Sequence, residues 1–116
     1  MANHFKDVRE HLSGLERAHK LITISRPINK DTELMPLVRW QFRGLPESER
    51  KAFLFTNVVD ALGRKYDMPV AVGCLAASRE VYALGLNCSV DEIASKWMHA
   101  ENNPIEPRLV ESAPVQ

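Results

Sequence analysis

The sequence predicts a mixed α+β (α/β) domain: a small sheet of three or more strands packed by about four helices, with an extended C-terminal segment. Three observations predict this class. Segments with apolar residues at helical spacing are interspersed with short β-branched or aromatic runs. The length of 116 residues suits one domain with one core. Three prolines after residue 103 exclude a regular helix there.

The first predicted helix begins after Asp7. Asp7 and Glu10 have the spacing of a capping box, in which the first side chain accepts from early helical amides and the second reaches back. Apolar residues recur here at spacings of three and four: Phe5, Val8, Leu12, Leu15 and Ala18. This spacing predicts a helix with one apolar stripe. Residues 21–25 (LITIS) are rich in β-branched side chains and precede Pro27, so they predict a strand.

A second helix is predicted from Asn29 to Gly44. Asn29, Asp31 and Thr32 are candidate N-terminal caps, and Gly44 is a candidate stop. Pro36 requires the regular helix to begin within about a turn of it.

Two further strands follow a polar loop. Residues 51–59 (KAFLFTNVV) alternate Phe53 and Phe55 with other side chains, which predicts the second strand. Gly63 predicts a hairpin turn. Residues 68–74 (MPVAVGC) are almost entirely apolar, so the third strand is predicted to be buried.

The last two helices have clear start signals. Ser78 is expected to cap a short helix that ends at Gly85, and Ser89 with Glu92 forms another capping box. Pro104 ends the final helix. Its apolar residues share one side: Val90, Ile93, Ala94 and Trp97. We therefore divide the chain into a domain over residues 1–103 and an extended partner-binding or linker segment over residues 104–116.

Charge and hydropathy exclude several function classes. Fifteen basic residues balance fifteen acidic ones, which argues against a partner that is nucleic acid or an anionic membrane. No apolar run approaches the ~20 residues that span a bilayer, and the start lacks the order of a secretion signal. Cys74 and Cys88 are expected to be free thiols in a reducing compartment, with a structural disulfide as the alternative. We expect a cytoplasmic protein without membrane attachment.

Motifs for chemistry are sparse. The histidines lack the i, i+4 spacing of a zinc helix, and the cysteines lack a C-x-x-C pair, so no metal site is predicted. Cys74 has apolar neighbours that favour a packed thiol over a nucleophile. Gly73, Ser78 and Arg79 lie where a strand leads into a helix, and the exposed amides there could hold a small anion. Tight packing of the strand against the helix is the alternative explanation. No catalytic residue is assigned.

The C-terminal segment carries apolar side chains that need cover. If buried, each is worth roughly 1.5–3 kcal/mol. Together with one tryptophan of the last helix they form a predicted partner interface: Trp97, Ile105, Leu109, Val110 and Val115. An extended segment of this kind can dock by adding a strand to a partner.

The order of these segments resembles the opening region of the UbiD-like carboxy-lyases, the prenylated-FMN-dependent decarboxylases of aromatic and α,β-unsaturated acids. The resemblance covers about residues 7 to 97 and depends on many short matches in order. The matching residues are Leu15, Glu16, Ala18, Ile22, Pro27, Glu33, Leu54, Phe55, Asn57, Pro69, Val70, Gly73, Ser78, Arg79, Leu84 and Gly85.

The resemblance implies an N-terminal domain without the catalytic machinery. In the family, a segment like residues 103–116 continues into a flavin-binding split barrel, and the cofactor pocket, the divalent-metal and potassium ligands and the Glu-Arg-Glu catalytic set lie downstream. No position of this sequence matches them. The resemblance thus implies that the chain binds no cofactor, and that prenylated FMN with its divalent metal and potassium belongs to a larger catalytic subunit.

Three hypotheses follow. The first is a small subunit or separate N-terminal domain of a UbiD-like decarboxylase, with a structural or assembly role and no catalysis alone. The second is a stand-alone small-anion-binding or interaction module without an enzyme partner. The third is a chain cut at a domain border.

Overall fold

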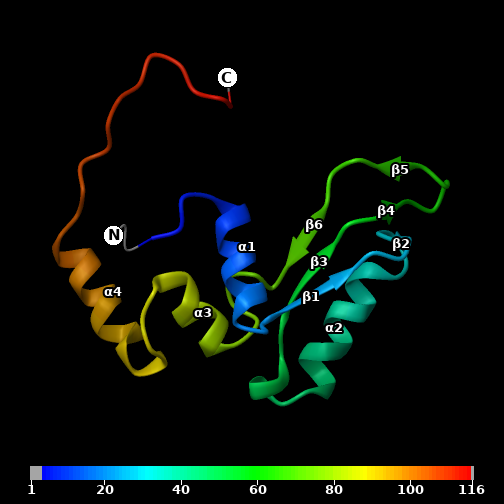
Figure 1. Cartoon of the computed structure of the whole chain (residues 1–116), viewed down its shortest axis with the longest axis horizontal. Coiled ribbons are helices and arrows are strands. Elements are labelled where there is room, and N and C mark those ends of the chain that lie inside the picture. Colours follow the sequence, from blue (N-terminus) through cyan, green and yellow to red (C-terminus); the bar gives the residue numbers. More distant parts are fainter. Residues whose placement is uncertain (1–3, 116) are drawn as a thin grey trace.

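The computed structural model describes residues 4–115, and these form helices and short strands in mixed order (Figure 1). This confirms the predicted α+β class. The elements, including two short 3₁₀ turns, are α1 (Val8–Arg17), β1 (Leu21–Ile24), β2 (Ile28–Asn29), α2 (Leu34–Gly44), η1 (Glu47–Glu49), β3 (Ala52–Phe55), β4 (Val58–Val59), β5 (Lys65–Tyr66), β6 (Val70–Val72), α3 (Arg79–Leu86), η2 (Val90–Glu92) and α4 (Ile93–Asn102).

The strands divide into two three-stranded sheets, with orders β1-β3-β6 and β2-β4-β5. In each sheet the central strand has one parallel and one antiparallel neighbour. The single strand predicted over residues 51–59 is therefore wrong, because β3 and β4 belong to different sheets. The break coincides with Pro27, which has no amide hydrogen to donate to a neighbouring strand. Across it the register of the paired strands shifts by one residue, from Ile24↔Phe55 in one sheet to Ile28↔Val58 in the other.

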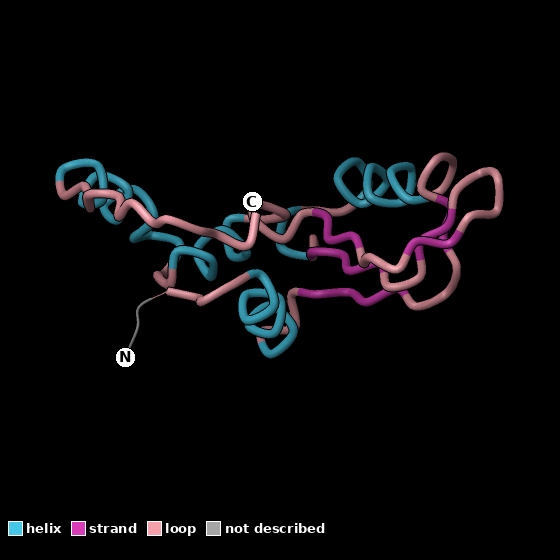
Figure 2. Tube along the Cα trace, turned by 90° about the horizontal axis from the view of Figure 1, so that it is seen from above, coloured by secondary structure: helices cyan, strands magenta, loops and turns pink. Residues whose placement is uncertain are grey.

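Two hydrophobic clusters lie on opposite faces of β3, where the sequence predicted one core. Alternate side chains of a strand point to opposite faces. Phe53 and Phe55 stack with their ring centroids 5.6 Å apart and pack with Leu34 and Val38 of α2. Ala52 joins the other cluster, which α1 and α3 complete: Leu15, Ala52, Ala77 and Val81. Figure 2 shows the strands between α2 on one side and α1 on the other.

The buried face of helix α1 coincides only in part with the predicted stripe, because Leu12 and Leu15 pack in the second cluster but Ala18 is exposed. Its buried residues are His11, Gly14 and Leu15, whereas Val8 is 63% exposed. Asp7 caps the helix as predicted, but Glu10 reaches one residue further back, to the amide of Lys6. A Cβ on Gly14 would lie 2.9 Å from the ring of Phe5, so glycine lets that ring pack against the helix.

Two further predictions are wrong: the second helix does not begin at Asn29, and the third strand is not fully buried. Asn29 lies in β2, and its side chain accepts from the amides of Asp31 and Thr32, so it organises a turn before α2 begins at Leu34. Pro36 falls in the first turn of that helix, as required. β6 is half-buried, because it is an edge strand.

Both α1 and α3 end with a left-handed residue that is not glycine. After α1, His19 (φ 56°) donates its amide to the carbonyl of Glu16, and Lys20 donates to Leu15. After α3, Asn87 (φ 53°) is the corresponding left-handed residue. The helix therefore ends at Leu86, one residue beyond the predicted stop at Gly85. Both ends are Schellman motifs, which glycine usually terminates.

The hairpin between β4 and β5 turns at Gly63 (φ 79°), as predicted. Its turn is organised by Asp60, a buried carboxylate that accepts from the amides of Leu62 and Arg64 at 2.9 and 2.8 Å and from the hydroxyl of Tyr66 at 3.1 Å. Burial raises the pKa of Asp60, but these hydrogen bonds and the charge of Arg64 outweigh it and lower the pKa below its ordinary value.

Helix α4 and the segment after it stand away from both clusters. The Ser89–Glu92 capping box forms as predicted and leads through η2 into α4. Helix α4 has no buried residue, and residues 104–115 have no helix or strand within the described chain. The radius of gyration is 16.9 Å, against about 13 Å for a compact chain of this length. The molecule is therefore open at this end. Among the described residues, no helix is both long and apolar enough to cross a membrane.

We predict that His19→Gly stabilises the chain. A left-handed conformation costs a residue with a Cβ about 1–2 kcal/mol, and glycine returns part of this through its larger unfolded-state entropy, so the net gain should be about 0.5–1 kcal/mol. Urea unfolding measures it. Asn87→Gly is the matched control and should gain less, because asparagine tolerates this conformation well. An equal or larger gain at Asn87 would contradict the explanation.

We also predict that Asp60→Asn destabilises the chain above pH 4 and that its effect disappears in acid. Because the folded pKa is lowered, the stabilisation is fully present above the unfolded pKa, near 3.8, and is lost as the pH falls through the folded pKa. The difference between wild-type and variant urea midpoints should shrink below about pH 4. Asp67→Asn, at an exposed side chain, is the control. A difference that stays constant into acid would refute the role of the charge.

Candidate functional site

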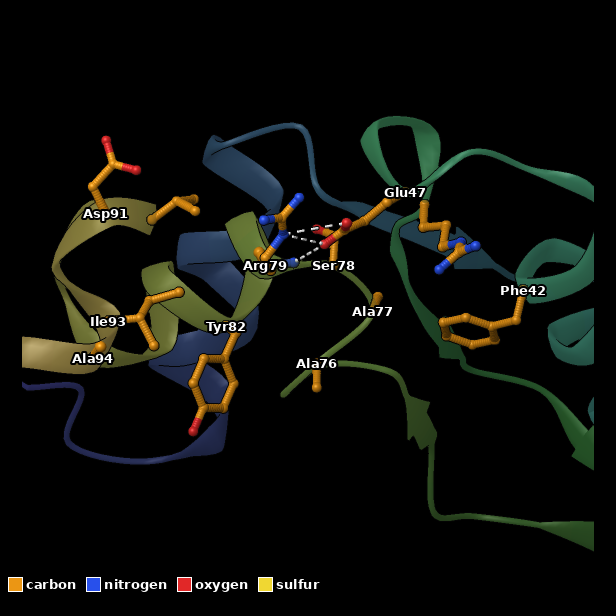
Figure 3. Close-up of a pocket in the computed structure, with 12 residues that line it drawn as sticks. Phe42, Glu47, Ala76, Ala77, Ser78, Arg79, Tyr82, Asp91, Ile93 and Ala94 are labelled. Atoms are coloured by element: carbon orange, nitrogen blue, oxygen red, sulfur yellow. Dashed lines mark hydrogen bonds and ion pairs between the residues drawn. The ribbon is translucent and has the colours of Figure 1, made fainter. Parts of the chain in front are cut away.

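The most developed polar cluster lines an open hollow of about 660 Å³ between η1, α3 and η2 (Figure 3). Figure 3 shows Glu47 and Arg79 pointing toward each other across its rim. Aromatic and aliphatic side chains form much of the wall, including Phe42, Tyr82 and Ile93. The hollow therefore combines an ion pair with an apolar surface.

The structure brings the predicted anion-site residues together at the start of α3. Gly73 (φ 73°) makes the turn after β6, and a Cβ there would lie 3.3 Å from Ala77. Ser78 is buried and caps α3 by accepting from the amide of Val81 at 3.2 Å. Arg79 is the first residue of the helix. Tight packing of the turn, the alternative explanation, is thus also present.

The carboxylate of Glu47 already binds the first amide of α3 and the guanidinium of Arg79. It accepts from the amide of Arg79 at 2.7 Å and from Nε of Arg79 at 3.2 Å. The amide of Arg79 first, and then its guanidinium, lower the pKa of Glu47 below its ordinary value. An external anion would have to displace an anion of the chain itself. Sequence reasoning missed Glu47, because it lies 32 residues from Arg79 and no local pattern joins them.

A second hollow, of about 590 Å³ and mostly apolar, lies between the N-terminal segment, α1, α3 and α4. His11 forms part of its floor, and its Nε2 donates to the carbonyl of Cys74 at 2.7 Å. On the wall, Nε1 of Trp97 donates to the hydroxyl of Tyr82 at 2.6 Å. Leu75 is largely exposed on the rim. We call this hollow the α1–α4 groove.

The residues predicted as a partner interface are exposed at the same end of the molecule. Trp97 lines the α1–α4 groove and is about half exposed. Ile105 and Leu109 are 94% and 97% exposed, and Val110 and Val115 are exposed as well. Figure 1 shows the segment leaving α4 and running apart from the other helices and strands. Helix α4 thus lines the groove with Trp97 and leads into a segment with exposed apolar side chains. The partner interface itself stays a prediction.

The remaining candidates offer no reactive arrangement in the described chain. Both Cys74 and Cys88 are free thiols, as predicted, and each is half-buried. Within residues 4–115, no three His, Cys, Asp or Glu side chains gather where they could hold a metal ion. Lys20 forms an ion pair with Glu80 of α3.

A comparison with protein-family models agrees with the family resemblance inferred from the order of the predicted segments. The family model of the 3-octaprenyl-4-hydroxybenzoate carboxy-lyase N-terminal domain matches residues 12–101, which run from the middle of α1 almost to the end of α4. No solved structure matches the chain. The match covers most of the sequence and confirms the resemblance seen over residues 7–97. The chain therefore belongs to the UbiD-like carboxy-lyase family, as a member of its N-terminal domain.

Proposed function

We propose that this chain is a small subunit, or separately made N-terminal domain, of a UbiD-like non-oxidative decarboxylase or carboxylase. Its substrates would be aromatic or α,β-unsaturated carboxylic acids, and prenylated FMN with a divalent metal and potassium would be held by a larger catalytic chain. The match to the N-terminal domain of a carboxy-lyase supports the family part of this proposal. The exposed apolar surface around α4 is the observation that supports the partner.

We infer that the described residues of this chain do not hold the cofactor. At the start of α3 the carboxylate of Glu47 accepts from the amide of Arg79, so a flavin phosphate would meet a negative charge there. The described residues bring no three carboxylate, imidazole or thiolate ligands together for a divalent metal. We therefore propose no chemical step on this chain. Its role would be to stabilise and position the catalytic chain.

The surface around α4 is suited to a lasting interface. Trp97 offers a large apolar area with its N–H already satisfied by Tyr82, so burying it leaves no unpaired donor. Ile105 and Leu109 offer side chains that are almost wholly in water. Covering such surface is the main favourable term in protein association. On this proposal the groove and the segment over residues 104–115 dock on the catalytic chain.

The proposal predicts a stable complex. The tagged chain, purified from its native host, should bring down a larger UbiD-like chain, and native mass spectrometry should give the mass of the complex, with decarboxylase activity. Leu109→Asp should weaken binding by tenfold or more, because a buried leucine contributes roughly 1.5–3 kcal/mol. Leu62→Asp, at a leucine on the β4–β5 hairpin that is also largely exposed, is the control and should bind normally. A lone monomer without associated decarboxylase activity would refute the proposal.

Thermal-shift measurements separate this function from a stand-alone anion-binding module. Because the carboxylate of Glu47 already binds the first amide of α3 and the guanidinium of Arg79, the wild-type chain should show no rise in Tm across a series of inorganic phosphate or benzoate concentrations. Glu47→Gln removes the charge and should allow a phosphate-dependent rise. A rise in the wild-type chain alone that disappears in Arg79→Ala would instead favour the anion-binding module.

A further inference from the structure

The solvent side of α2 carries a small surface that the proposed function does not use. Leu34, Val38 and Gln41 are the buried side of this helix. The exposed side presents a compact set of large side chains at helical spacing, which we call the α2 outer face: Met35, Arg39, Trp40 and Arg43. Spacings of three, four and eight residues place them on adjoining turns, so they form one surface.

The buried side of α2 fixes the position of the α2 outer face through core packing and hydrogen bonds. Leu34 and Val38 pack into the cluster around Phe53 and Phe55. The side chain of Gln41 makes two hydrogen bonds to the backbone of Lys51, donating at 2.8 Å and accepting at 2.9 Å. A partner would therefore meet a preformed surface and would not have to order it, which lowers the cost of binding.

Trp40 is the largest uncovered side chain of the face, with 66% of its area exposed. Its indole lies beside Gly44, where an added Cβ would be only 3.8 Å from the ring. Its N–H has no acceptor among the described residues, in contrast to the N–H of Trp97. An exposed tryptophan with an unused donor is a typical anchor residue of protein interfaces.

The charges of the face are uncompensated. Arg39 and Arg43 have no carboxylate within 4.0 Å in residues 4–115, whereas Arg26, Arg64 and Arg79 all do. Helix α2 itself contains no acidic residue. On a chain with no net charge, this is a local positive surface that complements a negative one.

The composition favours an acidic protein surface over other anions. Tryptophan, arginine and methionine are the side chains enriched in the cores of protein interfaces. Recognition of anionic lipid usually takes clusters of about four to eight lysines and arginines, and nucleic acid requires a basic face on the whole domain. Two arginines beside an aromatic ring fit a partner that supplies a few carboxylates around an apolar contact.

We propose that the α2 outer face is a second docking surface, and that its occupant is an acidic patch of the larger carboxy-lyase chain. This inference rests on the proposed function. Figure 1 shows α2 and α4 toward opposite ends of the molecule, so this contact is separate from the one at α4. Two separated contacts on one rigid chain would fix its orientation on the partner and raise the overall affinity.

The test measures binding of the full chain to the purified larger carboxy-lyase chain at low and high salt. Arg39→Glu/Arg43→Glu should weaken binding by tenfold or more at low salt and reduce its salt dependence, since charged contacts are screened by salt. Trp40→Ala should weaken it by a similar factor at both salt concentrations. Arg17→Glu/Lys65→Glu makes the same change of net charge at exposed cations outside α2 and should bind as the wild type does. Urea unfolding of each variant checks that the fold is intact.

The outcomes separate this inference from the proposed function. If the wild-type chain binds but the α2 variants bind equally well, the second docking surface is wrong and the proposed function stands. If Leu109→Asp binds normally while the α2 variants fail, the α4 interface is wrong instead. If the wild-type chain does not bind, both are overturned. Sedimentation with phosphatidylserine vesicles that requires Arg39 and Arg43 would show that lipid is the occupant, and would also overturn the inference.

Discussion

The structure depends on the alternation of side chains along β3. This central strand sends Phe53 and Phe55 toward α2 and Ala52 toward α1 and α3, so one strand of four residues separates two clusters. The two clusters are covered by α1, α2 and α3, and neither cluster contains a residue of α4. The consequence is a molecule whose helices α1, α2 and α3 are fixed by burial, while α4 and residues 104–115 present apolar side chains to water.

The contrast between the packed helices α1, α2 and α3 and the exposed α4 is relevant to the proposed function. The family match assigns the chain to an N-terminal carboxy-lyase domain, and the apolar side chains of α4 and the segment after it are exposed to water. The proposed supporting role depends on these two observations. The ion pair of Glu47 and Arg79 supports the same view, because it turns a potential anion site into a structural contact that ties η1 to the start of α3. Among the described residues, the exposed side chains proposed for binding are apolar around α4, and basic or aromatic on α2.

The features that the sequence predicted correctly are local ones. Asp7, Ser78 and the Ser89–Glu92 pair cap helices as expected, and Gly63 turns the hairpin, since each depends on residues within a few positions of one another. The division of the core, the break between β3 and β4, the burial of His11 and the contact of Glu47 with Arg79 depend on residues that are distant in the sequence, such as Glu47 and Arg79, which are 32 residues apart. No local pattern encodes these. The exposed apolar segment was predicted from composition alone, because prolines excluded the structures that could have buried it.

Amide hydrogen exchange of the chain, alone and with one equivalent of the larger carboxy-lyase chain, tests the central claim most directly, since burial in an interface protects amides in proportion to the local stability gained. The account predicts rapid exchange in α4 and residues 104–115 of the free chain and strong protection of both in the mixture, with the β4–β5 hairpin unchanged. Equal exchange in the two samples throughout residues 93–115 would contradict it, because the apolar end of the molecule would then remain uncovered in the presence of its proposed partner.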